Sequence, residues 1–110
     1  MHTNVKNLPT DQTYFTRHGY SDDGVWVVLK RTAKTVTLAR VNCSLDPEFK
    51  PEFSGGGFAA HCSNQSDQTW LFDRVETNYT ITARLTKNGW RGDGTQFSEN
   101  RAWRFYDFNF

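Results

Sequence analysis

The sequence predicts an all-β domain whose antiparallel hairpins form a half-barrel or a small sandwich, with at most short helical turns. Three observations support this prediction. Several segments are rich in β-branched residues and alternate apolar with polar side chains, as half-buried strands do. Turn signals built on Gly, Asn or Asp separate these segments. No segment of twelve or more residues shows the helical period together with capping residues.

The first predicted hairpin joins a strand at Val25–Arg31 to a strand at Val36–Val41 through a turn at 32–35. Both strands are rich in valine, threonine and leucine. Weaker strands are expected at 58–64, 68–74, 90–91 and 96–97. The remaining segments are expected to be irregular: a flexible stretch at 1–12, a long connection at 44–57 with a hinge at its three glycines 55–57, and at most a helical turn near 11–16 or 46–49.

The second predicted hairpin begins with the cleanest alternation in the chain, Tyr79–Thr86. Its odd-numbered residues, Tyr79 among them, are expected to point one way, while the even-numbered residues point the other. Asn88-Gly89 follows directly, and this dipeptide tolerates positive φ at both positions. A further turn is expected at Gly92–Gly94.

The last ten residues, Arg101–Phe110, include five aromatic rings and two arginines. Each large ring buries about 150–250 Å² when it is packed. In an extended strand the rings would fall on both faces. We therefore predict a docked strand whose faces are covered by the rest of the domain or by a second copy of the chain, and we expect a homo-oligomer.

The composition limits the classes of protein that fit. A chain of 110 residues predicts one domain, spanning 1–110. The formal net charge of +1 argues against a protein that grips long duplex DNA. No apolar run approaches the roughly 18 residues that span a bilayer, and no signal peptide is recognisable, so we expect no membrane contact and a cytoplasmic location. Eight arginines against five lysines favour binding of planar or phosphate-bearing anions.

The candidate ligand-binding residues are arginines and aromatic residues of the second half of the chain, joined by a polar cluster near residue 18. They are Arg84, Arg91, Arg101, Arg104, Trp90, Trp103 and Tyr106, with Arg17 and His18 completing an anion site. Guanidinium groups clamp phosphate, and flat rings stack on bases. The alternative is that these residues are solvated strand faces or core rings with arginine stems lying over them.

Catalytic and metal-binding patterns are weak. Cys43 and Cys62 are expected to be free thiols in a reducing compartment. His61 and Cys62 are neighbours on a strand and face opposite sides, so His61 cannot easily activate the thiol. Cysteine and histidine spacings do not fit zinc, and the carboxylates lie in solvated loops. The sequence therefore predicts a binding protein that is not an enzyme, with no metal site, catalytic residues or cofactor.

Several short segments form a recognisable pattern: Gly19–Asp22, Lys34–Thr37, Lys50–Phe53 running into Gly56–Phe58, His61–Cys62 with Asn64–Gln65, and Arg104–Phe110. Over residues 19–110 this pattern resembles a group of small proteins encoded by phages and prophage-like regions. Ala33 stands where a turn glycine is expected, so the first hairpin departs from the pattern.

This resemblance implies a phage accessory protein with an anti-defence role in the host cytoplasm. One such class is the sponge proteins that counter the Thoeris system, which sequester cyclic ADP-ribose signals without cleaving them. The leading hypothesis is thus a protein that sequesters a small anionic nucleotide. Two alternatives remain: an anti-CRISPR-like inhibitor that binds a host nuclease or other defence protein, and a β module that binds single-stranded nucleic acid.

Overall fold

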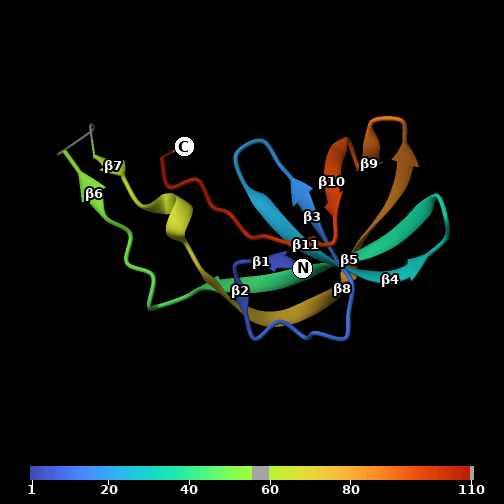
Figure 1. Ribbon diagram of the computed structural model, residues 1–110, viewed down its shortest axis with the longest axis horizontal. Coiled ribbons are helices and arrows are strands. Elements are labelled where there is room, and N and C mark those ends of the chain that lie inside the picture. The colour runs from blue at the N-terminus through green and yellow to red at the C-terminus, as the bar shows by residue number, and fades with distance from the viewer. Residues whose placement is uncertain (56–59, 110) are drawn as a thin grey trace.

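Strands dominate the computed structural model, which describes residues 1–55 and 60–109 (Figure 1). The strands are β1 (His2–Thr3), β2 (Val5–Lys6), β3 (Tyr14–His18), β4 (Asp23–Arg31), β5 (Thr35–Leu45), β6 (Phe53–Ser54), β7 (His61–Cys62), β8 (Trp70–Thr86), β9 (Gly89–Gly92), β10 (Thr95–Glu99) and β11 (Arg101–Ala102). A single 3₁₀ turn at Gln65–Asp67 is the longest helical element among the described residues. The predicted all-β class is confirmed, and the sheets pack in a sandwich-like arrangement.

The main sheet has seven strands in the order β2-β8-β5-β4-β3-β10-β9. β9 also pairs with the end of β8, through Leu85 opposite Trp90, so one end of the sheet closes into a small barrel. Every strand of this closed end contributes to one apolar cluster. Its buried members are Phe15, Trp26, Val36, Leu38, Ala83, Trp90 and Phe97.

A second apolar cluster covers the opposite face of β4 and β5 and packs against the chain termini. Val25, Val27 and Val41 belong to it, together with Val5 near the N-terminus and Ala102 near the C-terminus. Both faces of β4 are therefore buried at its centre. This explains the run of consecutive apolar residues there, which a strand with one solvated face would lack.

The turns follow backbone chemistry. The predicted turn between β4 and β5 is present, and Thr32 N donates to Thr35 O at 2.8 Å. Between β8 and β9 only Gly89 takes positive φ, at 100°, so the expectation of two such residues is corrected. The turn with two positive φ values lies instead at Asp93 (50°) and Gly94 (72°), and it joins β9 to β10 as a two-residue hairpin.

β8 is one strand of 17 residues, where the sequence predicts two separate segments. Its pairing with β5 jumps from Thr80 opposite Ala39 to Glu76 opposite Arg40, so 77–79 form a bulge. The bulge moves Tyr79 out of the alternation, and 58% of this residue is exposed. The residues predicted to share one face are therefore not buried alike, since Ala83 is buried whereas Tyr79 and Leu85 are exposed.

The N-terminal segment is anchored, in contrast to the flexible stretch expected at 1–12. β1 pairs in parallel with β11, and β2 pairs in parallel with β8. Asn4 and Val5 are buried between these pairs. A parallel pairing of two residues leaves too short a pattern to be recognised from sequence alone.

The aromatic C-terminal segment is docked, as predicted, but beyond β11 it is not a strand of a sheet. One isolated bridge links Phe105 to Asp23. Side-chain oxygens replace the partner strand elsewhere: Arg104 N donates to Asn4 Oδ1 (2.9 Å), Tyr106 N to Gln68 Oε1 (2.8 Å), Asp107 N to Asp22 Oδ1 (3.1 Å) and Phe108 N to Gln65 Oε1 (3.0 Å). These side chains pair backbone donors of a segment that is partly buried against the domain.

Most rings of this segment find partners within the same chain. Trp103 stacks on His2 at 4.6 Å between ring centroids, and Phe108 lies 6.1 Å from Phe49. Phe110 lies outside the described residues, and Tyr106 is 44% exposed. The rings that suggested an oligomer are thus largely covered by the domain itself, and the homo-oligomer stays a prediction.

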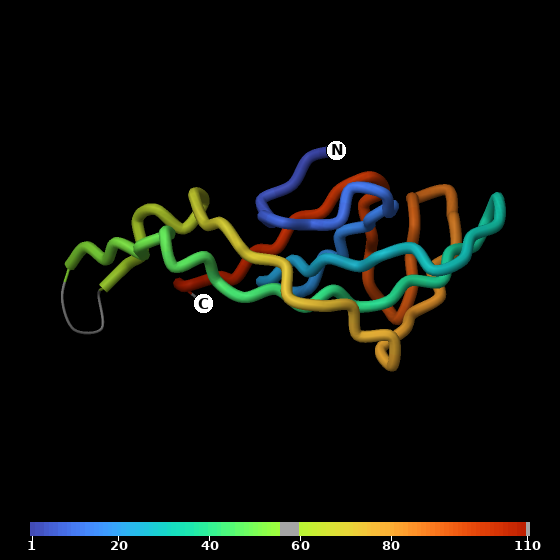
Figure 2. Tube along the Cα trace, turned by 90° about the horizontal axis from the view of Figure 1, so that it is seen from below, coloured from blue at the N-terminus to red at the C-terminus, as the bar shows by residue number. Residues whose placement is uncertain are grey.

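An arm extends from the barrel and contains the β6–β7 pair and the 3₁₀ turn (Figure 2). It gives the molecule a long axis of 50 Å against 29 and 24 Å. Within the described part of the predicted weak strand at 58–64, which begins at residue 60, β7 is the strand. Of the glycines predicted to form a hinge, Gly56 and Gly57 lie outside the described residues.

The base of the arm is tied to the N-terminal segment by Lys6 and Asp46. Lys6 Nζ lies 2.7 Å from Asp46 Oδ2, and this contact is the main cause that lowers the pKa of Asp46 to about 2. A carboxyl whose folded pKa is lowered stabilises the fold above its ordinary pKa of 3.8, and this contribution is lost as pH falls toward 2.

We therefore expect Asp46→Asn to lower the melting temperature at about pH 7 and to have much less effect at about pH 2. Thermal unfolding followed by circular dichroism at both pH values measures this difference. Asp73→Asn is the matched control, because Asp73 is exposed and its one hydrogen bond within the described residues is from the hydroxyl of Ser44. An equal loss for Asp46→Asn at both pH values would contradict the assignment.

Candidate functional site

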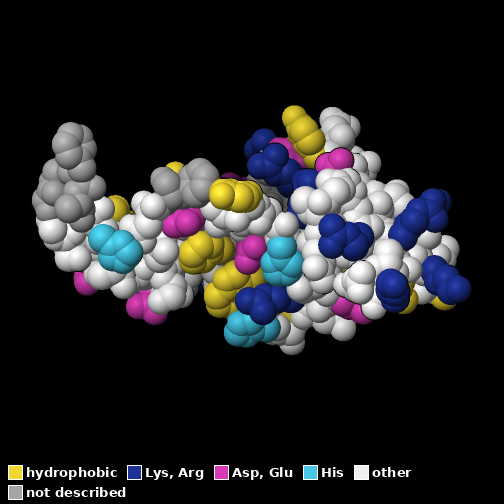
Figure 3. Space-filling view, turned by 90° about the horizontal axis from the view of Figure 1, so that it is seen from above, with side chains coloured by type: hydrophobic (Ala, Val, Ile, Leu, Met, Phe, Trp, Pro, Cys, Tyr) yellow, Lys and Arg dark blue, Asp and Glu magenta, His cyan; other side chains and the backbone are white. Residues whose placement is uncertain are grey.

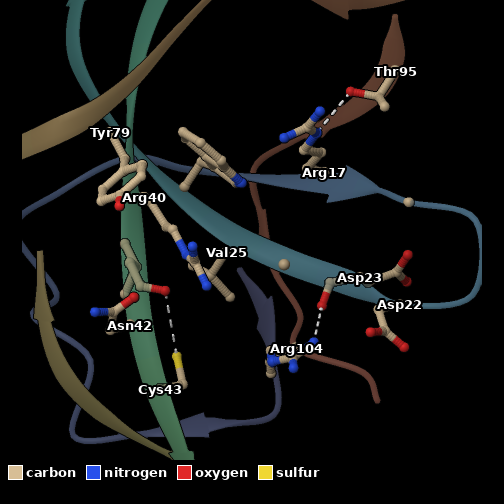
Figure 4. Close-up of a pocket in the computed structure, with 14 residues that line it drawn as sticks. Arg17, Asp22, Asp23, Val25, Arg40, Asn42, Cys43, Tyr79, Thr95 and Arg104 are labelled. Carbon is tan, nitrogen blue, oxygen red and sulfur yellow. Dashed lines mark hydrogen bonds between the residues drawn. The ribbon is translucent and has the colours of Figure 1, made fainter. Parts of the chain in front are cut away.

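A pocket of about 440 Å³ opens where β4 and β5 separate (Figure 4). Their pairing ends at Trp26 opposite Arg40, and 23–25 are not paired with 41–43. Residues of both separated ends line the pocket, together with residues from β3, the bulge of β8 and the C-terminal segment. A cavity of this size falls in the range of small-molecule sites.

Three arginines from three different parts of the chain line the pocket. Arg40 projects from β5 toward β4 in Figure 4, with Arg17 of β3 and Arg104 of the C-terminal segment on other sides. Arg104 Nη1 donates to Asp23 O and to Phe105 O, both at 2.9 Å, and its guanidinium lies 4.7 Å from the Trp70 ring centroid. Arg104 is therefore fixed in place.

The positive charge in the pocket is only partly balanced. Arg17 pairs with Asp93 at 3.1 Å, whereas Arg40 and Arg104 form no ion pair with any described carboxylate. Asp22 and Asp23 also line the pocket, but Figure 4 shows their carboxylates directed away from Arg40. The arrangement suits an anion that lies between Arg40 and Arg104.

Aromatic side chains supply the remaining contacts. Trp26 is 7% exposed and joins the barrel core to the pocket. A Cβ added to Gly24 would lie 3.8 Å from Trp26 Nε1, which places the indole N–H beside this pocket residue. The guanidinium of Arg40 lies over the Tyr79 ring, with its Cζ 5.8 Å from the ring centroid. A flat ligand in this pocket would therefore lie near both the ring of Tyr79 and the guanidinium plane of Arg40.

Cys43 is the only cysteine that lines the pocket among the described residues, and it is a free thiol. Burial is the main cause that raises the pKa of Cys43 to about 11. Its Sγ lies 4.0 Å from Val41 O, which is a weak contact. Val41 and Cys43 both belong to the part of β5 that is not paired with β4. A neutral thiol is a poor nucleophile, so Cys43 is not suited to attack a bound ligand.

The structure brings together only two of the nine predicted site residues, Arg17 and Arg104, in this pocket. Arg84 and Arg91 face each other across β8 and β9, both exposed and away from the pocket lining. The expected convergence of Arg84 and Arg91 with Arg104 is therefore wrong. Arg84 and Arg91 lie in the pairing of β8 with β9 that closes the barrel, and neither residue lines the pocket.

The predicted aromatic residues also separate. Trp90 is 6% exposed and packs edge-on against Phe15 at 5.6 Å, so it is a core residue rather than a stacking surface. Trp103 lies between His2 and Arg101, whose guanidinium is 5.1 Å from the indole centroid. Arg101 Nε is buried without a hydrogen-bond partner among the described residues. These residues and Tyr106 do not line the pocket.

His18 belongs to a different cluster. Its Nδ1 lies 3.1 Å from Asp23 Oδ1, and its Nε2 lies 2.6 Å from Ser98 Oγ. The side chain is 35% exposed. His18 is thus held from both ring nitrogens, and it does not line the pocket.

Sequence reasoning missed Arg40, Tyr79 and Trp26. Arg40 stands in a predicted strand as its one charged residue among apolar neighbours, and that isolation was the available signal. The bulge that exposes Tyr79 has no turn residue pattern beyond Asn78. Nothing in the sequence shows that β4 and β5 separate after Trp26.

Comparisons with protein-family models, with curated proteins and with solved structures found no match. The described part of the chain contains no helix of sufficient length and apolarity to cross a membrane. Among the same residues no cluster of His, Cys, Asp and Glu is arranged to hold a metal ion.

Proposed function

We propose that this protein binds a small anionic nucleotide in the pocket between β4 and β5 and holds it without cleaving it. The observation that carries the proposal is the pairing of two arginines that lack carboxylate partners, Arg40 and Arg104, in a pocket of about 440 Å³. A phosphate between them would gain charge-assisted hydrogen bonds, which are stronger than neutral ones.

The base of such a ligand has two ring contacts available. Tyr79, which is 58% exposed, and Trp26 both belong to the pocket lining. Stacking of a base on an aromatic ring contributes about 1–3 kcal/mol. Together with the resemblance to phage-encoded proteins, this supports a signalling nucleotide such as a cyclic ADP-ribose or a cyclic nucleotide as the ligand.

Retention of the intact ligand follows from the chemistry of the lining. Cys43 is the one lining thiol, and burial keeps it protonated. The carboxylates of Asp22 and Asp23 already accept hydrogen bonds, from Asp107 N and from His18 respectively. No nucleophile with an adjacent base is found among the described lining residues.

The test is isothermal titration with a panel of nucleotides, followed by denaturation and mass measurement of the released ligand. We expect Arg40→Gln to weaken binding by about tenfold to a hundredfold, because a hydrogen bond to a charged group contributes about 1.5–3 kcal/mol. Arg40 is exposed and forms no described hydrogen bond, so its loss should leave the fold intact.

Arg84→Gln is the matched control, since it removes the same charge from a neighbouring strand outside the pocket. We expect its affinity to equal that of the unmodified protein. Equal losses in the two variants would indicate attraction by overall charge alone. Absence of binding to any cyclic nucleotide or ADP-ribose species at micromolar concentration would remove the proposal.

A further inference from the structure

Three side chains form a continuous hydrogen-bonded row at the edge of the pocket, whose lining includes Asp23 but not the other two. Ser98 Oγ lies 2.6 Å from His18 Nε2, and His18 Nδ1 lies 3.1 Å from Asp23 Oδ1. All three residues are partly accessible to solvent. On the face that Figure 3 shows, histidine, acidic and basic side chains lie close together near the middle of the molecule.

The sheet register explains why these residues meet. His18 is the direct partner of Asp23 across β3 and β4. Ser98 is the partner of Thr16 across β3 and β10. Thr16 and His18 are two residues apart on β3 and therefore point to the same face. The imidazole thus lies between the carboxylate on one side and the hydroxyl on the other.

In the neutral tautomer of His18 that carries its proton on Nδ1, Nδ1 donates to the carboxylate of Asp23 and Nε2 accepts from the hydroxyl of Ser98. A hydroxyl next to an imidazole whose tautomer is fixed by a carboxylate is the arrangement that activates serine in many hydrolases of unrelated fold. We propose that Ser98, His18 and Asp23 form a serine nucleophile site that is acylated by activated esters.

The step balances within these groups. Ser98 Oγ forms a bond to the ester carbonyl carbon while its proton passes to His18 Nε2. His18 then gives that proton to the departing alcohol as the ester C–O bond breaks. A water molecule next attacks the acyl group, loses a proton to His18 and releases the carboxylic acid, and the proton returns to Ser98 Oγ.

The surroundings select the class of substrate. The described residues contain no helix longer than the 3₁₀ turn at Gln65–Asp67, so no helix N-terminus supplies donors to a developing oxyanion at Ser98. Loss of such donors costs about 10²–10³ in rate. Esters with good leaving groups depend least on this stabilisation.

The experiment uses the full-length protein, a fluorophosphonate probe and 4-nitrophenyl acetate. The probe transfers its phosphonyl group to Oγ with loss of fluoride, and peptide mass analysis locates the modified serine. We expect Ser98 to be labelled at least about 10²-fold faster than Ser44. Ser44 is the matched control, since its hydroxyl contacts a carboxylate, Asp73 at 3.1 Å, but no histidine.

Variants separate activation from simple exposure. His18→Gln should reduce labelling of Ser98 by about 10²-fold or more, and Ser98→Ala should abolish release of 4-nitrophenol above the level of buffer. Asp23 positions His18, so Asp23→Asn should lower kcat for the ester with KM nearly unchanged. Circular dichroism of each variant checks the fold.

Labelling of Ser98 no faster than Ser44, or labelling unaffected by His18→Gln, overturns the inference. This site shares only Asp23 with the lining of the proposed nucleotide pocket. Arg40→Gln should leave Ser98 labelling unchanged, and Ser98→Ala should leave nucleotide affinity unchanged, so failure of one proposal is distinguishable from failure of the other.

Discussion

Replacing Gln68 by alanine should lower the free energy of unfolding by about 3–4 kcal/mol and release the C-terminal segment from the domain. Gln68 is 2% exposed. Its Oε1 accepts from Tyr106 N at 2.8 Å and from Trp70 Nε1 at 2.9 Å, and its Nε2 donates to Tyr106 O at 3.0 Å. One amide therefore satisfies polar groups of two separate segments.

The size of this effect comes from the groups that the substitution leaves behind. A buried donor or acceptor without a partner costs about 1–3 kcal/mol, more than a hydrogen bond contributes on average. Alanine at position 68 would leave the indole N–H of Trp70 unpaired beside the second apolar cluster. Water can reach the Tyr106 groups more easily, because Tyr106 is 44% exposed.

Chemical denaturation measures the loss, and hydrogen exchange at the amide of Tyr106 measures release of the segment. Gln65→Ala is the matched control: Gln65 also binds the segment, through Phe108 N, but its side chain accepts only that one described bond. We expect the control to cost about 1 kcal/mol. A similar small loss for Gln68→Ala would show that the segment is held by its rings instead.

Gly92→Ala is expected to cost about 3 kcal/mol and to open the barrel between β8 and β9. Gly92 ends β9, where the sheet closes. An added Cβ would lie 2.8 Å from Thr82 O, 3.0 Å from Ala83 Cα and 3.0 Å from Ile81 Cγ2. Two of these atoms belong to the backbone of β8 and cannot move without disturbing the sheet.

Loss of near-ultraviolet circular dichroism from Trp90 would report the opening, and a lowered denaturation midpoint would report the cost. Gly24→Ala is the control, because its added Cβ meets only Trp26 Nε1, at an ordinary 3.8 Å. We expect the control to lie within about 0.5 kcal/mol of the unmodified protein. A tolerated Gly92→Ala would mean that the two strands can separate without loss of stability.

The strands and turns were predictable where the pattern is local. Val25–Arg31 and Val36–Val41 correspond to parts of β4 and β5, and the second hairpin corresponds to the end of β8 and β9. Docking of the C-terminal segment was predictable, but the way in which it docks was not. Amide side chains such as that of Gln68 can bind any backbone group, and their positions follow no periodic pattern in the sequence.

The candidate site was less predictable. Arg104 and Arg17 were singled out and do line the pocket, but Arg84 and Arg91 were assigned to the same surface and lie elsewhere. Their spacing gives the face of a strand, not the position of that strand in the sheet. Arg40 was overlooked because one charged residue in an otherwise apolar strand is also what a strand with a solvent-exposed face shows.

The sequence by itself determined the all-β class, the main hairpins and the need to cover the aromatic C-terminal residues, since alternation and turn chemistry act over a few neighbouring residues. Tertiary structure alone decided that β4 and β5 part after Trp26, that a bulge turns Tyr79 outward, and that His18 meets Ser98. These features depend on where pairing between strands begins and ends, and the limits of pairing are set by contacts among residues far apart in the chain.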